Sequence, residues 1–168
     1  LISSHASVDF FPVGTTTVTY MATDAFGNAS TASFDVTVTD DELPSILDLP
    51  ADIIQPNDPG VGCGAVATWA EPTATDNCAI ATLTSTHAAG AFPVGTTTVT
   101  YSASDIHGNQ STASFDVTVT DDEAPVITNM PADITQTNDP GGCSAVVTWT
   151  APIVTDNCGI GSTASTHA

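Results

Sequence analysis

The stretch FPVGTTTVTY occurs twice in this chain, at Phe11–Tyr20 and at Phe92–Tyr101. A longer stretch, STASFDVTVTDDE, occurs at Ser30–Glu42 and again at Ser111–Glu123. The short stretches PADI and DNC recur at the same interval of 80–81 residues. Self-similarity at a fixed interval is typical of repeat architectures, in which each copy is one structural module. The chain is therefore read as a tandem repeat.

The repeated segments carry the pattern of β-strands. Apolar and polar residues alternate along Phe115–Thr120, as in a half-buried strand. The same alternation points Val99 and Tyr101 inward, and places Ala65, Ala67 and Trp69 on one face. Asp105–Asn109 is predicted to be a turn between two strands, with glycine and asparagine supplying a permissive backbone. With no convincing 3.6-residue period, the sequence predicts an all-β fold of tandem immunoglobulin-like or fibronectin-III-like β-sandwich repeats of about 80 residues.

The repeats are out of phase with the ends of the chain. Three equivalent stretches, LISSHA at 1–6, LTSTHA at 83–88 and TASTHA at 163–168, place both ends in the middle of a repeat. We therefore expect the C-terminal half of one repeat at 1–40, a complete repeat at 41–121 and the N-terminal half of another at 122–168. A half-sandwich of 40 residues cannot bury a core alone. Either the chain is a window onto a long array, which we favour, or the trailing half of one copy completes the leading half of the next; both imply a fibre.

The charge of the chain restricts its partners. The 168 residues include 19 Asp and Glu but no Lys or Arg, which gives a formal net charge of −19. Nothing in the chain can neutralise phosphate, so a nucleic-acid partner is excluded, and anionic membrane surfaces are disfavoured. No apolar run is long enough to span a membrane, so direct membrane insertion is not expected. We expect an excerpt of a longer secreted product.

The ordered set of motifs resembles the hyalin repeat. PADI, NDPG, CGAV, TDNC, FPVGTTTVTY and VTVTD follow one another in the order of that family, over the whole chain. The resemblance implies an immunoglobulin-like module of extracellular proteins, usually in tandem, with an adhesive or structural role and no enzymatic activity. It also implies a location on the cell surface or in a secreted fibre.

Two cysteines are present in each repeat, Cys63 and Cys78 in one and Cys143 and Cys158 in the next. Such regular pairs suit an oxidising compartment. The hyalin pattern usually has two more, and their positions here hold Leu49 and Ala113. The loss of one bonded pair implies that the remaining cysteines of a repeat, Cys63 and Cys78, bond to each other, which needs a chain reversal near Pro72. The alternative is a bridge between repeats, from Cys63 to Cys158.

The acidic clusters indicate calcium at the joints between repeats. Counting strand directions from Asp41 brings three segments to one pole of the complete repeat, and their candidate ligands are Asp40, Asp41, Glu42, Asp76, Asp105 and Asn109. At the second joint the candidates are Asp121, Asp122, Glu123 and Asp156. Calcium takes six to eight oxygen ligands, including carboxylates and Asn carbonyls. In the alternative interpretation these are ordinary turn residues on an acidic surface that keeps a fibre soluble.

Other polar residues carry weaker signals. His5, His87 and His167 recur at equivalent positions and are interpreted as packing or turn residues. Asn28 and Asn109 begin NAS and NQS, which match the N-glycosylation sequon. No nucleophile motif with a clustered base is present, so no catalytic residue is expected.

The sequence therefore predicts a structural segment of a long extracellular fibre or adhesin stalk. It would be made of disulfide-bonded hyalin-like repeats that are stiffened by calcium, and its partners would be neighbouring repeats or copies of the same protein. The alternative is a cell-adhesion or ligand-binding module that recognises a surface glycan or receptor. Such a site normally shows exposed aromatic residues, and the aromatic residues here are expected to point mostly inward.

Overall fold

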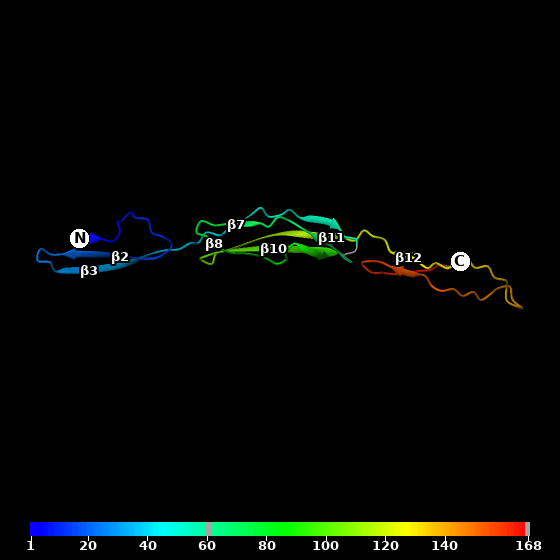
Figure 1. Ribbon diagram of the computed structural model, residues 1–168. Coiled ribbons are helices and arrows are strands. Elements are labelled where there is room, and N and C mark those ends of the chain that lie inside the picture. The colour runs from blue at the N-terminus through cyan, green and yellow to red at the C-terminus, as the bar shows by residue number, and fades with distance from the viewer. Residues whose placement is uncertain (60–61, 167–168) are drawn as a thin grey trace. The chain divides into compact units, whose positions relative to one another are not determined.

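The computed structural model of the chain describes residues 1–59 and 62–166. The described residues form strands and turns without a helix, so the predicted all-β fold is confirmed (Figure 1). No helix long and apolar enough to cross a membrane occurs in that part of the chain. The chain divides into two units: the first comprises Leu1–Asp48, Pro72–Thr84 and Tyr101–Ala113, and the second comprises Leu49–Glu71, Ser85–Thr100 and Ser114–Ala168.

The strands form two larger sheets and three short pairs. The leading half contains a three-stranded sheet in the order β1 (Ile2–Ser3), β2 (Gly14–Thr23), β3 (Ala29–Val38). The complete repeat contains a four-stranded sheet in the order β5 (Ile53–Pro56), β11 (Gln110–Thr120), β10 (Gly95–Asp105), β8 (Ile80–Ser85). The pairs are β4 (Ser45–Leu47) with β7 (Thr73–Thr75), β6 (Gly64–Ala67) with β9 (Gly90–Pro93), and β12 (Val126–Thr128) with β13 (Ile153–Thr155).

The core of the complete repeat follows the predicted alternation. On β11, Phe115, Val117 and Val119 are buried, and the intervening residues Asp116 and Thr118 are partly exposed. Val99 and Tyr101 on β10 are also buried, as predicted. On β6, Ala65 and Ala67 are fully buried opposite β9, whose Phe92 closes the same core. Alternate side chains of a strand point to opposite faces, which explains why this two-residue period marks the interior.

An aromatic cluster fills one end of this core. The Trp69 ring lies 5.1 Å from the Phe115 ring in an edge-to-face arrangement and 5.9 Å from the Phe92 ring. Edge-to-face pairs of this kind contribute about 0.5–1.5 kcal/mol beyond their buried area. Trp69, Phe92 and Phe115 come from three separate segments of the repeat, so a core of this type requires the whole repeat.

The leading hairpin has the same pairing register as its repeated copy. In the leading half, Thr15 bonds to Thr37 and Thr17 to Asp35 across β2 and β3. The corresponding bonds in the complete repeat join Thr96 to Thr118 and Thr98 to Asp116. The short pairs repeat in the same way, because Ser45 faces Thr75 in β4–β7 and Val126 faces Thr155 in β12–β13. Identical or similar sequence therefore gives the same local structure in each copy.

Candidate metal site and disulfide

A tight turn after β10 presents Asp105. The Asp105 amide donates to the carbonyl of Asn109, at 3.1 Å, and Gly108 takes a φ of 96°, which favours glycine. One carboxylate oxygen of Asp105 accepts from the amides of His107 and Asn109, each at 2.8 Å, and the other accepts from Asn109 Nδ2 at 2.6 Å. Burial by itself raises the pKa of Asp105, but these hydrogen bonds outweigh it and hold the pKa below its ordinary value of 3.8. Asp105 is therefore an ionised, buried carboxylate.

The loop after β7 presents Asp76. Asp76 Oδ1 accepts from the amides of Cys78 at 2.9 Å and Ala79 at 3.3 Å, which fixes the carboxylate at the start of the loop. Its other oxygen, Oδ2, is buried and has no hydrogen-bond donor among the described residues. A buried carboxylate oxygen without a donor is unusual, because leaving it unpaired costs about 1–3 kcal/mol or more.

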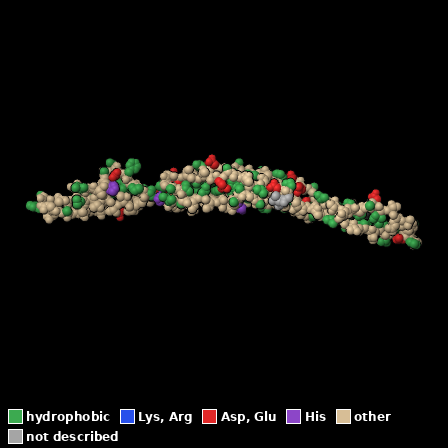
Figure 2. Space-filling view, viewed as in Figure 1, with side chains coloured by type: hydrophobic (Ala, Val, Ile, Leu, Met, Phe, Trp, Pro, Cys, Tyr) green, Lys and Arg blue, Asp and Glu red, His purple; other side chains and the backbone are tan. Residues whose placement is uncertain are grey.

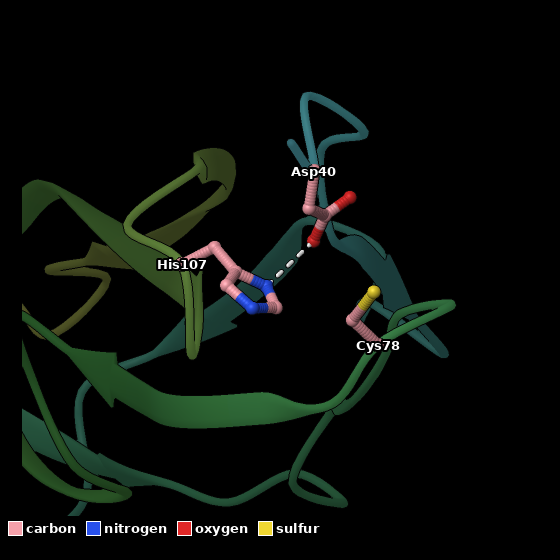
Figure 3. Close-up of side chains that lie close together, drawn as sticks. All are labelled: Asp40, Cys78 and His107. Atoms are coloured by element: carbon pink, nitrogen blue, oxygen red, sulfur yellow. Dashed lines mark hydrogen bonds and ion pairs between the residues drawn. The ribbon is translucent and has the colours of Figure 1, made fainter. Parts of the chain in front are cut away.

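Asp40, at the end of the leading half, lies beside both loops. Its side chain is only 2% exposed, and one carboxylate oxygen is 3.0 Å from Nδ1 of His107. Asn109 Nδ2 donates to the Asp40 carbonyl at 3.1 Å. Figure 3 shows the Asp40 carboxylate between the His107 ring and the Cys78 side chain. Burial raises the pKa of the Cys78 thiol, and the Asp40 carboxylate raises it further.

The structure brings three of the predicted ligands together. Carboxylate oxygens of Asp40, Asp76 and Asp105 all lie within 4.8 Å of one another, although the residues are far apart in sequence. The first unit contains all three. The other candidates differ: Asp41 and Glu42 are exposed, and Asn109 turns its amide nitrogen rather than its oxygen toward Asp40 and Asp105. With no Lys or Arg in the chain, this cluster has only His107 as a potential cationic neighbour among described residues.

Sequence reasoning missed two neighbours of this cluster. Sγ of Cys78 and Nδ1 of His107 form a second group with Asp40, again within 4.8 Å of one another. The recurrence of histidines drew attention to His5, His87 and His167 instead. His107 does not recur, because Phe26 occupies its place in the leading half. The signal that was available was its position, two residues after Asp105 in the turn.

The second joint presents its predicted ligands differently. Asp121, Asp122 and Glu123 are exposed, and Asp156 is half-buried. Asp156 repeats the role of Asp76, since its Oδ1 accepts from the Cys158 amide at 2.8 Å. An open depression of about 410 Å³ lies here and is lined by Glu123, Ala124, Val126, Thr155, Asp156 and Asn157. No group of three metal-binding side chains is found at this joint in the described part of the chain.

The disulfide prediction was wrong in its preferred pairing. The structure bonds Cys63 to Cys158, the alternative between repeats, with Cα atoms 4.5 Å apart. Both residues belong to the second unit. The chain does not reverse near Pro72, because β6 pairs with β9 while β7 continues on to pair with β4 in the first unit. Residues between Cys63 and Cys78 therefore run onward, and each extended residue adds about 3.3 Å.

The other two cysteines carry no disulfide. Cys78 is half-buried and Cys143 is exposed, and both are free thiols. The four predicted disulfide cysteines thus divide into one bonded pair and two unbonded residues. Cys78 and Cys143 are equivalent to Cys158 and Cys63 by the repeat interval.

The predicted glycosylation sites lie in equivalent turns with different exposure. Asn28 is exposed, and its Nδ2 donates to Asp24 at 2.8 Å. Asn109 is half-buried, and its Nδ2 is held by Asp105 and by Asp40. A glycan on Asn109 would replace one of the two Nδ2 hydrogens and so break at least one of these hydrogen bonds, and Asn28 is the more accessible of the two predicted sites.

The repeated histidines lie beside aromatic rings. His5 stacks on Phe11 at 5.4 Å, and the His87 ring lies 6.1 Å from the Phe92 ring. Such contacts suit the expected packing role. His167 lies outside the described residues.

Several aromatic residues expected to face inward are exposed. Phe10 is 98% exposed, Phe26 is 93%, Trp149 is 63% and Phe34 is 52%. Figure 2 shows hydrophobic side chains interspersed with acidic ones on the visible face. The expectation holds in the complete repeat, where Phe92, Tyr101 and Phe115 are buried, and only in part in the half-repeats, where Phe11 and Tyr20 are partly buried.

Known proteins with similar sequences support one family. The family model described as HYR domain matches residues 1–38 and 39–119. A hyalin of Strongylocentrotus purpuratus is 40% identical over 96% of this chain and 14% of its own length. A hyalin of Lytechinus variegatus is 39% identical over 94% of this chain and 31% of its own length.

A more distant relative shares part of the chain. Sushi, von Willebrand factor type A, EGF and pentraxin domain-containing protein 1 of Rattus norvegicus is 34% identical over 65% of this chain and 3% of its own length. The chain thus spans less than a third of each of these relatives. No solved structure matches.

Proposed function

The chain belongs to the HYR domain family, and we propose that it is a structural segment of a long extracellular fibre or adhesin stalk. In this proposal the repeats are joined end to end, and the partners of the chain are neighbouring repeats or copies of itself. The role is mechanical rather than enzymatic. An extracellular location is supported by the bond between Cys63 and Cys158, since disulfides persist in oxidising compartments.

The observation that carries this proposal is the exposure of core residues in the two half-repeats. Trp69 contacts Phe115 in the complete repeat. Its equivalent in the trailing half, Trp149, is 63% exposed, and the equivalent of Phe115 in the leading half, Phe34, is 52% exposed. Each half therefore displays one member of a contact that the complete repeat makes internally.

The two halves also match in extent. Residues 122–162 carry the front of a repeat and residues 1–40 carry its back, so together they supply the elements of 41–121. The match extends to the joint. In the leading half, the Asp24–Asn28 turn has the same hydrogen bonds as the Asp105–Asn109 turn and lines its own open depression of about 410 Å³. In a completed repeat this turn would lie next to Asp156, in the same way that Asp105 lies next to Asp76.

We propose further that calcium binds at the joints. The residues fit such an ion, because three carboxylates converge in the first joint and Asp76 Oδ2 lacks a donor. Asp40, Asp76 and Asp105 would hold the ion, with remaining positions filled by backbone oxygens or water. Bound calcium would offset the mutual repulsion of the carboxylates and tie the end of one repeat to two loops of the next.

A ligand-binding role is the second candidate, and one observation favours it. Phe10 is 98% exposed, and the equivalent position in the complete repeat is Ala91. No aromatic residue occupies this position in the complete repeat, so packing of a front half against the leading half is not expected to bury Phe10. An exposed aromatic ring of this kind suits contact with a glycan or a receptor surface.

End-to-end assembly tests the structural proposal. The chain should form concentration-dependent oligomers in sedimentation velocity experiments, and Trp149→Ala should abolish them because it removes the exposed half of the aromatic contact. Val146→Ala is a matched control, since its equivalent in the complete repeat, Val66, is 48% exposed and takes no part in the core. Assembly that is equally strong with Trp149→Ala would contradict completion of the half-repeats by another copy. A chain that stays monomeric at all concentrations would contradict a fibre assembled from copies and favour a fibre made of continuous repeats.

A further inference from the structure

We propose that the Cys63–Cys158 disulfide carries tension past the core of the complete repeat, and that the parallel pair of β5 and β11 bears the load only where this bond is absent. The inference rests on the proposed role as a stalk or fibre, and it names the elements that resist stretching. Both cysteines, β5 and the paired residues 117–120 of β11 belong to the second unit.

The disulfide encloses most of the complete repeat in a covalent loop. Cys63 and Cys158 are 95 residues apart in sequence, and the bond holds their Cα atoms 4.5 Å apart. The strands from β6 to β13 all lie between the two cysteines. Tension on the chain before Cys63 and after Cys158 therefore passes directly from one cysteine to the other, and it cannot draw out the residues between them. The bond limits how far the chain extends.

Without the bond, tension would pass through the sheet of the complete repeat. β5 lies in the front of this repeat, β11 is its last strand, and the two strands pair in parallel, beginning with Ile53 opposite Val117. Force on the chain before β5 and force on the chain after β11 would act in opposite directions along these strands. The strands would have to slide past each other, so all of their hydrogen bonds would be loaded at the same time.

Two hydrogen bonds extend the parallel pair beyond both ends of β5. At one end, Asp52 Oδ1 accepts from the Asp116 amide at 2.9 Å. At the other end, the Asn57 amide donates to the Thr120 carbonyl at 2.8 Å. Sliding of β5 along β11 would break these bonds together with those of the strands themselves, so the pair resists tension over more than the length of β5.

The leading hairpin has the contrasting geometry. β2 and β3 are antiparallel, and Gly14 lies opposite Val38 where the two strands meet the rest of the chain. Force on the chain before β2 and after β3 would act at this end and across the strands, so it would open their hydrogen bonds one after another. The leading hairpin should therefore open at a lower force than the parallel pair of β5 and β11.

Stretching single molecules by their two ends tests the proposal. The unsubstituted chain is compared with a double variant, Cys63→Ser with Cys158→Ser, and the remaining thiols of both proteins are blocked with iodoacetamide. The double variant should reach a final length about 310–340 Å greater, because the 95-residue separation of the cysteines can then extend by about 3.3–3.6 Å per residue. The extra length should appear in an abrupt step, at a higher force than the opening of the leading hairpin.

Two further measurements guard against a misfolded variant and locate the load. Dithiothreitol takes up the bond as its own cyclic disulfide and leaves two protein thiols, so adding it to a stretched unsubstituted molecule should give the same lengthening in a chain that folded with its bond. Asp52→Ala in the double variant should lower the force of the abrupt step without changing its length. Asp133→Ala, at the equivalent position of the trailing half, is the matched control and should change neither.

Two outcomes would overturn the inference. Equal final lengths with and without the bond would show that the disulfide does not carry the tension. Extra length that is released gradually, without an abrupt step, would show that β5 and β11 do not bear the load. Neither outcome depends on assembly, because each molecule is stretched alone. A chain that stays monomeric in sedimentation would therefore reject a fibre made from copies and leave the load path standing.

Discussion

The two copies of STASFDVTVTDDE, at Ser30–Glu42 and Ser111–Glu123, have the same sequence and the same hairpin register but different burial. Phe115 is 3% exposed in the complete repeat, and Phe34 is 52% exposed in the leading half. Because the residues are identical, the difference comes from what lies against them. Phe115 is packed against Trp69, and the residue equivalent to Trp69 is not supplied by the leading half.

This difference separates local from non-local contributions to the fold. Alternation, threonine cross-strand pairs and the glycine turn are sufficient for the hairpin, since they produce it in both copies. Val18 is 2% exposed in the leading half, so one small residue is buried there, but burial of the large Phe ring needs the opposing strands that 41–121 provides for Phe115. Large apolar side chains gain about 1.5–3 kcal/mol on full burial, so packing of the front half of a repeat against Phe34 would stabilise the leading hairpin.

The largest expected effect comes from making the same Phe→Ala substitution in both copies and comparing the loss of stability. Phe115→Ala should lower the free energy of unfolding by about 3–5 kcal/mol, as expected for a buried Phe. Phe34→Ala should lower it by less than about 1 kcal/mol in dilute monomer, where the ring is half-exposed. Urea denaturation of both variants measures the effect. Equal losses would mean that the leading hairpin has a core of its own.

The two joints should differ in their response to calcium, and the expected effect on stability is smaller than that of Phe115→Ala. If calcium binds the folded chain at 100 times its dissociation constant, it stabilises that state by about 2.7 kcal/mol, which appears as a higher melting temperature than in EDTA. Asp76→Ala should remove this rise, because Asp76 belongs to the three-carboxylate cluster. In EDTA the variant loses the hydrogen bonds from the Cys78 and Ala79 amides together with one repelling charge, so its own melting temperature in EDTA is the baseline for its calcium response.

The matched control for calcium is Asp156→Ala in the second joint. No three carboxylates converge there among the described residues, so this variant should keep most of the calcium-dependent rise when the protein is monomeric. Both variants are measured in dilute protein, so that association between copies does not contribute to the melting temperature. A melting temperature that does not respond to calcium would contradict the proposed ion, and equal losses in the two variants would contradict its location.

The strands and part of the acidic site could be predicted from the sequence alone. Val99, Tyr101 and Phe115 follow from a two-residue alternation that local geometry enforces. Strand direction alone brought Asp40, Asp76 and Asp105 to one pole. The sequence analysis missed His107 and Cys78, because a turn and a loop from distant segments meet only through tertiary packing, and the one available signal was the position of His107 two residues after Asp105.

The disulfide could not be derived from spacing. Cys63 is 15 positions from Cys78 and 95 from Cys158, and the shorter loop was favoured. The outcome depended on whether the chain reverses near Pro72, and that is decided by which strands β6 and β7 pair with. The exposed aromatic residues were missed for a related reason, since the inward phase of a strand buries a side chain only when a second layer is present.

Amide hydrogen exchange by NMR along the two identical stretches tests most directly whether the half-repeats are completed by another copy. Intrinsic exchange rates are the same for both stretches, so each is the control for the other. The account predicts fast exchange at Phe34–Val38 and slow exchange at Phe115–Val119 in dilute protein. It also predicts slowed exchange at Phe34–Val38 once the unsubstituted chain has assembled. Equal protection in the dilute monomer, or fast exchange at Phe34–Val38 that persists in the assembly, would contradict it.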